Sequence, residues 1–288
     1  MNGQNLVEEP AKAGVETKRQ TRVVTGHNGR ANILGFMVDK MTLQQCVERL
    51  VAGIPARRCQ HIVLVNAAKI VRAREDAELA QIIRTADLVG ADGVPIVWTS
   101  QVLAQPLPGR VNGTDLMNQL IQVAAERGYR IYLLGSTPEL IERAVANVQR
   151  RYPKLQIAGY RHGYFSSVEQ EREVVTAIAA SRADILLVGM STPMKEKWVR
   201  KYKNDLATPV IHGVGGSFDI LAGYVKRAPL WMQCSGLEWF YRVLQEPKRL
   251  WRRYLVTNSI YIGLVIRQVA ANLFGAKNTP PQGRTTIG

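Results

Sequence analysis

Short apolar runs alternate with longer segments of helical periodicity through most of this chain. The runs are typical of buried strands and cover residues 61–66, 86–91, 130–135, 156–160, 183–189 and 209–214. Between them, apolar residues recur at helical spacing over 68–85, 114–127, 136 onward, 168–181 and 193–206. The alternation predicts an α/β fold, a Rossmann-like, mostly parallel sheet with helices on both faces.

The pattern also divides the chain into segments. Residues 1–30 are polar and predict a disordered arm, and residues 276–288 predict a disordered tail. The α/β domain is expected over 31–223, followed by a basic, amphipathic helical appendage over 224–275. Thr114 or Asp115 is the expected N-cap of the helix over 114–127.

The charge of the chain predicts an anionic partner. The net charge is +15 over 288 residues, which suits nucleic acid, an anionic membrane surface or a phosphorylated substrate. Basic residues gather in the appendage among aromatic ones: Lys226, Arg227, Arg242, Lys248, Arg249, Arg252 and Arg253. Residues 255–274 are strongly apolar but interrupted by polar positions, which favours an interfacial helix over a membrane span. The alternative is a helix packed on the core.

Cysteines and the N-terminal segment indicate the compartment. The three cysteines are widely spaced and odd in number, which excludes a disulfide framework and a zinc site. A reducing, cytosolic compartment is the simplest interpretation. The first thirty residues have no apolar core of a signal peptide, so no secretory signal is expected.

The segment after the second predicted strand contains the clearest candidate for chemistry. Asp92 follows the run 86–91, and ligands of open α/β sheets bind at the carboxyl ends of strands. Arg110 and Asp115 lie on a Gly/Pro-rich loop that can fold back over it. By pattern alone, Asp92 is a reacting carboxylate or a helix cap, and Asp115 is expected to be a cap.

Glycines follow three predicted strands, at Gly135, Gly189 and the segment Gly213 to Asp219. Glycine lets backbone N–H groups approach a phosphate, so three such loops favour a nucleotide or sugar nucleotide. Neither a strict G-x-G-x-x-G nor a Walker A sequence occurs, and no D-x-D pair supports a metal-clamped site. A leaving diphosphate would then be met by cations such as Arg110, Lys195 and Arg227. The isolated histidines, His27, His61, His162 and His212, are not expected to be catalytic.

Several motifs occur in an order that resembles the WecG/TagA/CpsF glycosyltransferases, family 26, over roughly residues 32–254. They are the segments around Asn66, Asp92-Gly93-Val94-Pro95, Pro106 to Asp115, Gly135, Tyr152-Pro153, Gly163-Tyr164-Phe165, Gly215 to Asp219, Arg227-Ala228-Pro229 and Gly236 to Trp239. The resemblance implies an inverting, metal-independent enzyme without a cofactor. Such enzymes move a hexosyl or N-acetylhexosaminyl group from a UDP-sugar to a polyprenyl-diphosphate-linked saccharide.

The resemblance also implies a place and residue roles. The family acts at the cytoplasmic face of the bacterial inner membrane, and its products feed teichoic acid, common antigen, capsule or exopolysaccharide. Asp92 falls on the proposed catalytic base, and the donor site is expected to include Asn66, Arg110, Gly135, Lys195, Glu196, Gly215, Gly216, Phe218 and Asp219. The acceptor diphosphate and the membrane are expected to meet Arg227, Arg242, Arg249, Arg252 and Arg253.

Two departures from the family pattern leave the donor sugar open. Leu64 stands where the family usually has threonine, and Lys195 replaces a glutamine. A lysine there could face the diphosphate or a donor carboxylate, so glucose or a uronic acid is open beside N-acetylmannosamine. The alternatives are a basic nucleic-acid-binding module and another nucleotide-dependent enzyme on the same fold. An oligomer is also possible.

Overall fold

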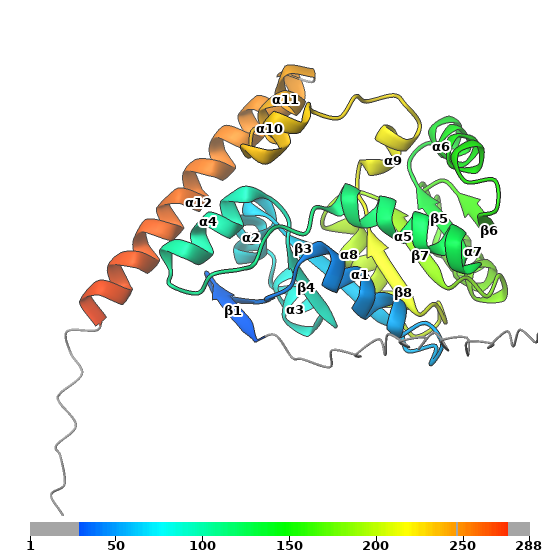
Figure 1. Cartoon of the computed structure of the whole chain (residues 1–288), viewed down its shortest axis with the longest axis horizontal. Helices are drawn as coiled ribbons and strands as arrows, with labels where there is room; N and C mark the ends of the chain where they lie inside the picture. The colour runs from blue at the N-terminus through cyan, green and yellow to red at the C-terminus, as the bar shows by residue number, and fades with distance from the viewer. Residues whose placement is uncertain (1–28, 246, 276–288) are drawn as a thin grey trace, which may run out of the picture.

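The computed structural model describes residues 29–245 and 247–275. Its centre is a six-stranded, all-parallel sheet in the order β4-β3-β8-β7-β5-β6 (Figure 1). The strands are β3 (Gln60–Val65), β4 (Leu88–Ala91), β5 (Arg130–Gly135), β6 (Gln156–Arg161), β7 (Ile185–Gly189) and β8 (Val210–Gly213). The predicted α/β fold is confirmed, and its sheet is parallel throughout. The predicted arm, except for residues 29 and 30, and the predicted tail lie outside the described residues.

The strand order places a switch point between β3 and β8. Counted from β3, the order is 2-1-6-5-3-4, which differs from the Rossmann order 3-2-1-4-5-6. The chain leaves β3 toward β4 at one edge, then crosses to the other half of the sheet and returns to β3 through β8. Open α/β sheets bind ligands where connections diverge in this way. A small antiparallel hairpin, β1 (Arg30–Ile33) and β2 (Phe36–Asp39), forms a separate sheet.

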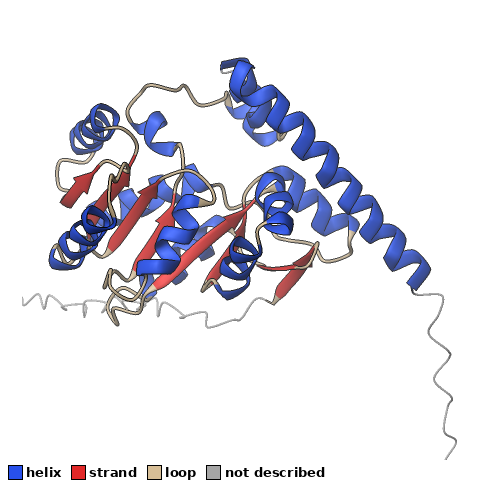
Figure 2. Cartoon of the chain, turned by 180° about the vertical axis from the view of Figure 1, so that it is seen from behind, coloured by secondary structure: helices blue, strands red, loops and turns tan. Residues whose placement is uncertain are grey.

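Helices cover both faces of the parallel sheet (Figure 2). They are α1 (Leu43–Ala52), α2 (Ala67–Glu75), α3 (Ala77–Thr85), α4 (Val94–Val102), α5 (Gly113–Arg127), α6 (Pro138–Arg151), α7 (Val168–Ala180), α8 (Met194–Tyr202), α9 (Ser217–Leu221), α10 (Leu230–Cys234), α11 (Glu238–Gln245) and α12 (Pro247–Gly275). Side chains alternate along each strand, so Leu64 packs in the cluster with α1 and α5, whereas Val63 and Val65 pack in the cluster with α2 and α3.

Two predicted helix boundaries are wrong for local reasons. The helix expected over 68–85 is interrupted at Asp76, whose backbone is extended and whose carboxylate accepts a hydrogen bond from the Leu79 amide at 3.0 Å. The N-cap expected at Thr114 or Asp115 is instead Asn112, because its side-chain oxygen accepts from both of their amides. In both places, a polar side chain accepts hydrogen bonds from the first amides of a helix and so fixes where that helix begins.

The long C-terminal helix packs on the core along one side and exposes apolar side chains along another. Tyr261 of α12 is buried in the core cluster of α2 and α3, and its hydroxyl lies 2.8 Å from Thr99 Oγ1 of α4. Figure 1 shows α12 running past α4 and α2. The other side of the helix exposes apolar residues at spacings of seven, four and seven, which places them on one face: Leu255, Ile262, Ile266 and Leu273. No helix within the described residues has the length and apolar character needed to cross a membrane.

Candidate functional site

A pocket of about 650 Å³ lies at the carboxyl ends of the parallel strands. Residues that directly follow five of those strands line it: Asn66, Asp92, Ser136, Met190 and Val214. The appendage closes its far side with Arg227, Glu238 and Trp239, together with Tyr254 and Asn258 of α12. The volume is in the range of small-molecule sites. The switch point of the sheet therefore forms a pocket that residues distant in the sequence complete.

Asp92 lies in this pocket, and its carboxylate does not cap α4, the helix that follows it. The N-cap of α4 is the next residue, Gly93, which has φ +107° and makes no side-chain cap hydrogen bond. The Asp92 amide donates to Val65 O at 2.8 Å and so ties the residue to the end of β3. Burial is the main cause that raises the pKa of Asp92, and the charge of Lys69 opposes it. A carboxylate with a raised pKa is a better proton acceptor than an exposed one.

Two lysines share one carboxylate oxygen beneath Asp92. Glu196 Oε1 lies 2.7 Å from Lys69 Nζ and 2.9 Å from Lys195 Nζ, and all three side chains are buried. Lys69 Nζ also donates to Leu64 O at 2.6 Å, and Lys195 Nζ donates to Thr192 Oγ1. We call Lys69, Lys195 and Glu196 the ion cluster. It places positive charge at the floor of the pocket, which Lys195 lines.

Burial and mutual charge set the pKa values within the ion cluster. Burial, followed by repulsion from Lys69, lowers the pKa of Lys195 to about 8, and Glu196 opposes that change. For Glu196, burial is outweighed by the charges and hydrogen bonds of the two lysines, which lower its pKa to about 2. The ion cluster has two basic groups and one acidic group, and this excess of basic groups favours an anionic ligand at the floor of the pocket.

Glycines allow the ion cluster to approach the sheet. A Cβ on Gly213 would come within 2.9 Å of the Cδ and Cε atoms of Lys195, so the lysine stem lies directly over β8. His212, the preceding residue, is fully buried, and its Nε2–H donates to Gly113 O at 3.0 Å. Burial lowers the pKa of His212 to about 4, so this imidazole is neutral at pH 7 and holds the start of α5 in place.

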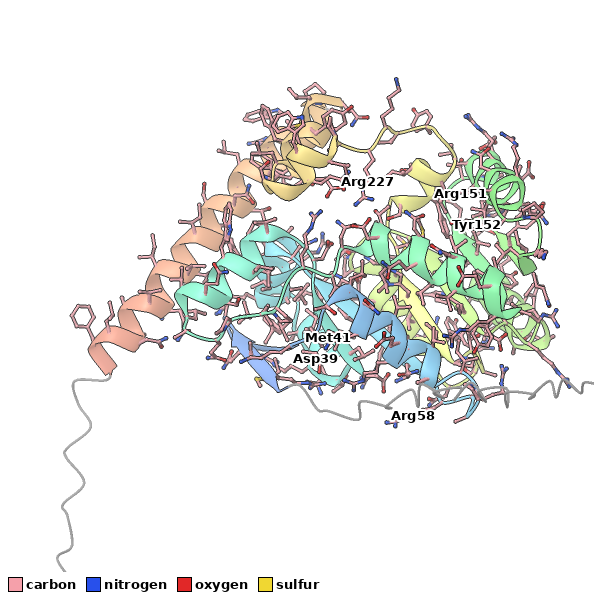
Figure 3. All side chains as sticks on the ribbon, viewed as in Figure 1. Asp39, Met41, Arg58, Arg151, Tyr152 and Arg227 are labelled. Atoms are coloured by element: carbon pink, nitrogen blue, oxygen red, sulfur yellow. The ribbon has the colours of Figure 1, made fainter. Side chains whose placement is uncertain are left out.

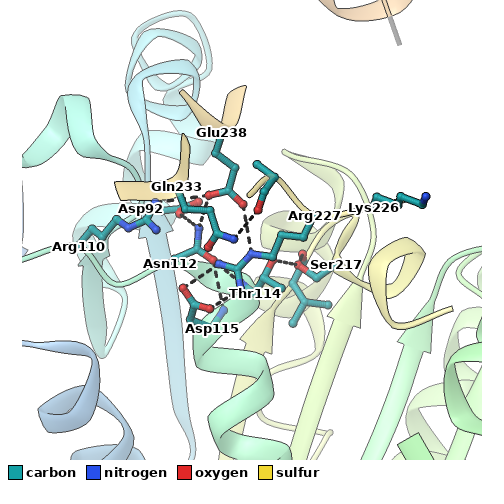
Figure 4. A network of polar contacts seen from close by, with 12 residues as sticks. Asp92, Arg110, Asn112, Thr114, Asp115, Ser217, Lys226, Arg227, Gln233 and Glu238 are labelled. Atoms are coloured by element: carbon teal, nitrogen blue, oxygen red, sulfur yellow. Dashed lines mark hydrogen bonds and ion pairs between the residues drawn. The ribbon is translucent and has the colours of Figure 1, made fainter. Parts of the chain in front are cut away.

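The appendage enters the site through ion pairs and hydrogen bonds (Figure 4). Arg227 binds both carboxylate oxygens of Asp115, at 2.6 and 2.9 Å. Glu238 Oε2 lies 3.4 Å from Arg110 Nη1 and 3.4 Å from Asn112 Nδ2. In Figure 3, Arg227 lies between its loop and the α/β body. The bidentate geometry makes the Asp115–Arg227 pair the tightest ionic link between these two parts among the described residues.

Seven of the residues expected at the donor or acceptor site line the pocket. They are Asn66, Arg110, Lys195, Gly215, Gly216, Asp219 and Arg227. Asn66 also caps α2, because its Oδ1 accepts from the Lys69 amide at 2.9 Å. The structure thus brings together, in one pocket, expected site residues that lie up to 161 positions apart, from Asn66 to Arg227.

Three residues expected to contact the donor are not among those that line this pocket. Phe218 is fully buried, and its ring lies so close to Gly189 that a Cβ there would come within 2.3 Å. A Cβ on Gly135 would come within 2.5 Å of the Gly189 backbone. Glu196 belongs to the ion cluster. Close packing explains Gly135 and Phe218, and the ion pairs with Lys69 and Lys195 explain Glu196.

The arginines expected to meet the acceptor or the membrane follow Arg227 along the chain. Arg252 is exposed on α12. The backbones of Arg242, Arg249 and Arg253 belong to α11 and α12, but their side chains lie outside the described part of the structure.

Sequence reasoning missed three polar residues of the site: Lys69, Asn112 and Glu238. Lys69 lies one turn after Asn66, so its side chain returns to the end of β3, a signal that spacing alone could have given. Asn112 and Glu238 lie within two of the motif segments, but no local pattern gave them a role, because their contact joins positions 126 residues apart. Within the described residues, no group of three or more His, Cys, Asp or Glu could hold a metal ion.

Comparison with known proteins identifies the family. The sequence model of the Glycosyl transferase WecG/TagA/CpsF family matches residues 31–273. The chain is 33% identical over 228 residues to an "N-acetylglucosaminyldiphosphoundecaprenol N-acetyl-beta-D-mannosaminyltransferase" of Staphylococcus aureus, covering 78% of this chain and 89% of that protein. A Bacillus spizizenii protein of the same name is 36% identical over 211 residues, covering 73% and 80%. The chain belongs to this family and is a glycosyltransferase.

We expect the Glu196→Gln substitution to destabilise the fold strongly. It leaves two buried lysines without a carboxylate, and breaking a buried ion pair costs about 3–5 kcal/mol. Glu78→Gln is the matched control, because Glu78 pairs with Lys197 at an exposed site, where pairs contribute about 0–1 kcal/mol. The free energy of unfolding from urea titration measures both. Equal, small losses would contradict the structural role of the ion cluster.

Proposed function

We propose that this member of the WecG/TagA/CpsF family transfers a sugar from a UDP-sugar to a polyprenyl-diphosphate-linked saccharide by a single, inverting displacement. The observation that carries this proposal is the placement of Asp92, a carboxylate with a raised pKa, in a pocket that five basic residues also line. The family supplies the reaction class, and the names of the relatives supply the lipid-linked acceptor. The product would enter a cell-surface polysaccharide.

The donor diphosphate would bind among Arg110, Lys195 and Arg227. These cations line the pocket beside the glycine loop Gly215-Gly216, whose backbone N–H groups can face phosphate oxygens. Cations and preorganised amides stabilise negative charge where it develops on a leaving group. We therefore propose that the chain's own residues meet the charge of the departing UDP, without a metal ion.

In the reaction, Asp92 would accept the proton of the acceptor hydroxyl. The hydroxyl oxygen attacks the anomeric carbon of the donor and forms the new glycosidic bond. The bond from that carbon to the UDP oxygen breaks at the same time, and UDP leaves from the opposite face with the electron pair. Because the attack comes from the face opposite to UDP, the anomeric configuration inverts.

The transferred sugar belongs to the hexosyl or N-acetylhexosaminyl class in this proposal. The relatives are named for N-acetylmannosamine, but Leu64 and Lys195 line the pocket of this chain. A buried ammonium at the floor also suits a uronic acid donor. Release of UDP over a panel of UDP-sugars, with a lipid diphosphate acceptor, identifies the donor.

We expect Asp92→Asn to lower turnover by about a hundred- to ten-thousand-fold, the usual contribution of a positioned base. The amide has nearly the same shape, so the fold and donor binding should remain. Acceptor-dependent UDP release measures turnover, and calorimetric titration with UDP measures binding. Near-normal turnover in a folded Asp92→Asn protein would remove Asp92 from the mechanism.

We further propose that residues 224–275 form an appendage that attaches the enzyme peripherally to the cytoplasmic face of the inner membrane. The apolar stripe of Leu255, Ile262, Ile266 and Leu273 is exposed on α12, and the basic residues of the segment suit anionic lipids. The buried Tyr261 anchors the same helix to the α/β domain.

The double substitution Ile262→Glu/Ile266→Glu should weaken binding to anionic phospholipid vesicles at least tenfold, since inserting one such side chain contributes about 1.5–3 kcal/mol. The control is Val168→Glu, which changes an exposed apolar residue of α7. Vesicle sedimentation measures the bound fraction. If the double variant and the control sediment alike, the stripe does not contact the membrane.

A further inference from the structure

Glu238 places a second carboxylate beside Asp92, and it comes from the appendage. Glu238 begins α11, and Figure 4 shows its side chain pointing into the site from the side opposite Asp115. Asn112 lies between the two carboxylates. Its Nδ2 is 3.4 Å from Glu238 Oε2 and 3.5 Å from Asp92 Oδ1. One amide group therefore connects the proposed base to the appendage.

The contacts of Glu238 are too weak to explain its presence as a structural link. Its distances to Arg110 and Arg227 are 3.4 and 3.5 Å, and all three side chains are about one-fifth exposed. Ion pairs of that kind contribute little to stability. The shorter, bidentate Arg227–Asp115 pair holds the same segment. The appendage thus has a stronger attachment that does not involve Glu238.

The electrostatic effect of Glu238 falls on Asp92. Its negative charge raises the pKa of Asp92, in the same direction as burial. The groups that face Asp92 from other elements act against it: the charge of Lys69 on α2, the side chain of Asn66 and the amide of Gly113 on α5. Lys195 on α8 also interacts with Asp92. Glu238 is the charged group that the appendage contributes to this balance.

We propose that Glu238 is a positioning residue that strengthens Asp92 as a base and orients Arg110 and Asn112 beside it when the appendage covers the site. The proposal rests on the proposed function of Asp92. Under this proposal, Asp92 reaches its full basicity only when the appendage covers the pocket, because Glu238 belongs to the appendage. A pocket without the appendage would then hold a weaker base.

The test is the pH dependence of kcat/KM in the full chain, with Glu238→Gln and Glu238→Asp. The glutamine keeps the shape and loses the charge. Without that charge the pKa of Asp92 should fall, so the acid limb, where kcat/KM drops as Asp92 becomes protonated, should move to lower pH. The rate above the limb should fall by less than about tenfold, well below the loss expected for Asp92→Asn. The aspartate keeps the charge and shortens the side chain, so its limb should stay close to that of the unsubstituted protein.

If Glu238 were only structural, Glu238→Asp should change the pH profile and kcat/KM more than Glu238→Gln, since glutamine preserves the contacts better than aspartate. An acid limb that does not move in Glu238→Gln would overturn the proposal, and so would loss of the folded state in that variant, followed by circular dichroism. Glu171→Gln is the control, because it removes a carboxylate charge that pairs with Lys201 outside the pocket and should leave the limb in place. These outcomes differ from failure of the proposed function, in which the unsubstituted protein releases no UDP or Asp92→Asn stays active.

Discussion

The ion cluster under the pocket is the interaction on which the site depends. Glu196 holds two lysines together in a buried position, where either lysine alone would be unfavourable. Lys69 then limits how far burial raises the pKa of Asp92, and Lys195 gives the pocket floor its charge. The glycine at 213 is required by the same arrangement, because the lysine stem lies over it. The position of Lys195 therefore depends both on its ion pair with Glu196 and on the space that Gly213 leaves for its stem.

The second part of the site comes from the C-terminal appendage. The packing of α12 on α2 and α4 positions this appendage, because it brings α11 above the strand ends. Arg227 then pairs with Asp115 at the start of α5. The segment that carries the exposed apolar stripe is thus the one that covers the pocket. Under the proposed function, this one segment would link membrane attachment to the covering of the pocket.

The layered fold could be predicted from the sequence because its signals are local. Apolar runs mark strands, and the residue after each strand lies at the same edge of a parallel sheet, which is how Asp92 was placed correctly in a pocket. The predictions that failed depended on competition between neighbouring caps, at Asp76 and Asn112. Glu238 could not be assigned a role, because Arg110 and Asn112, its partners in the α/β domain, are more than a hundred residues away and no periodicity connects them.

The configuration of the new glycosidic bond tests the central claim most directly, since it depends on the path of the displacement. Proton NMR of the product formed in the first turnovers, with an α-linked UDP-sugar as donor, reports that configuration. Attack by a hydroxyl that Asp92 deprotonates, opposite to the departing UDP, predicts a β-linked product. An α-linked product would require retention, and it would contradict the single displacement on which the role of Asp92 is based.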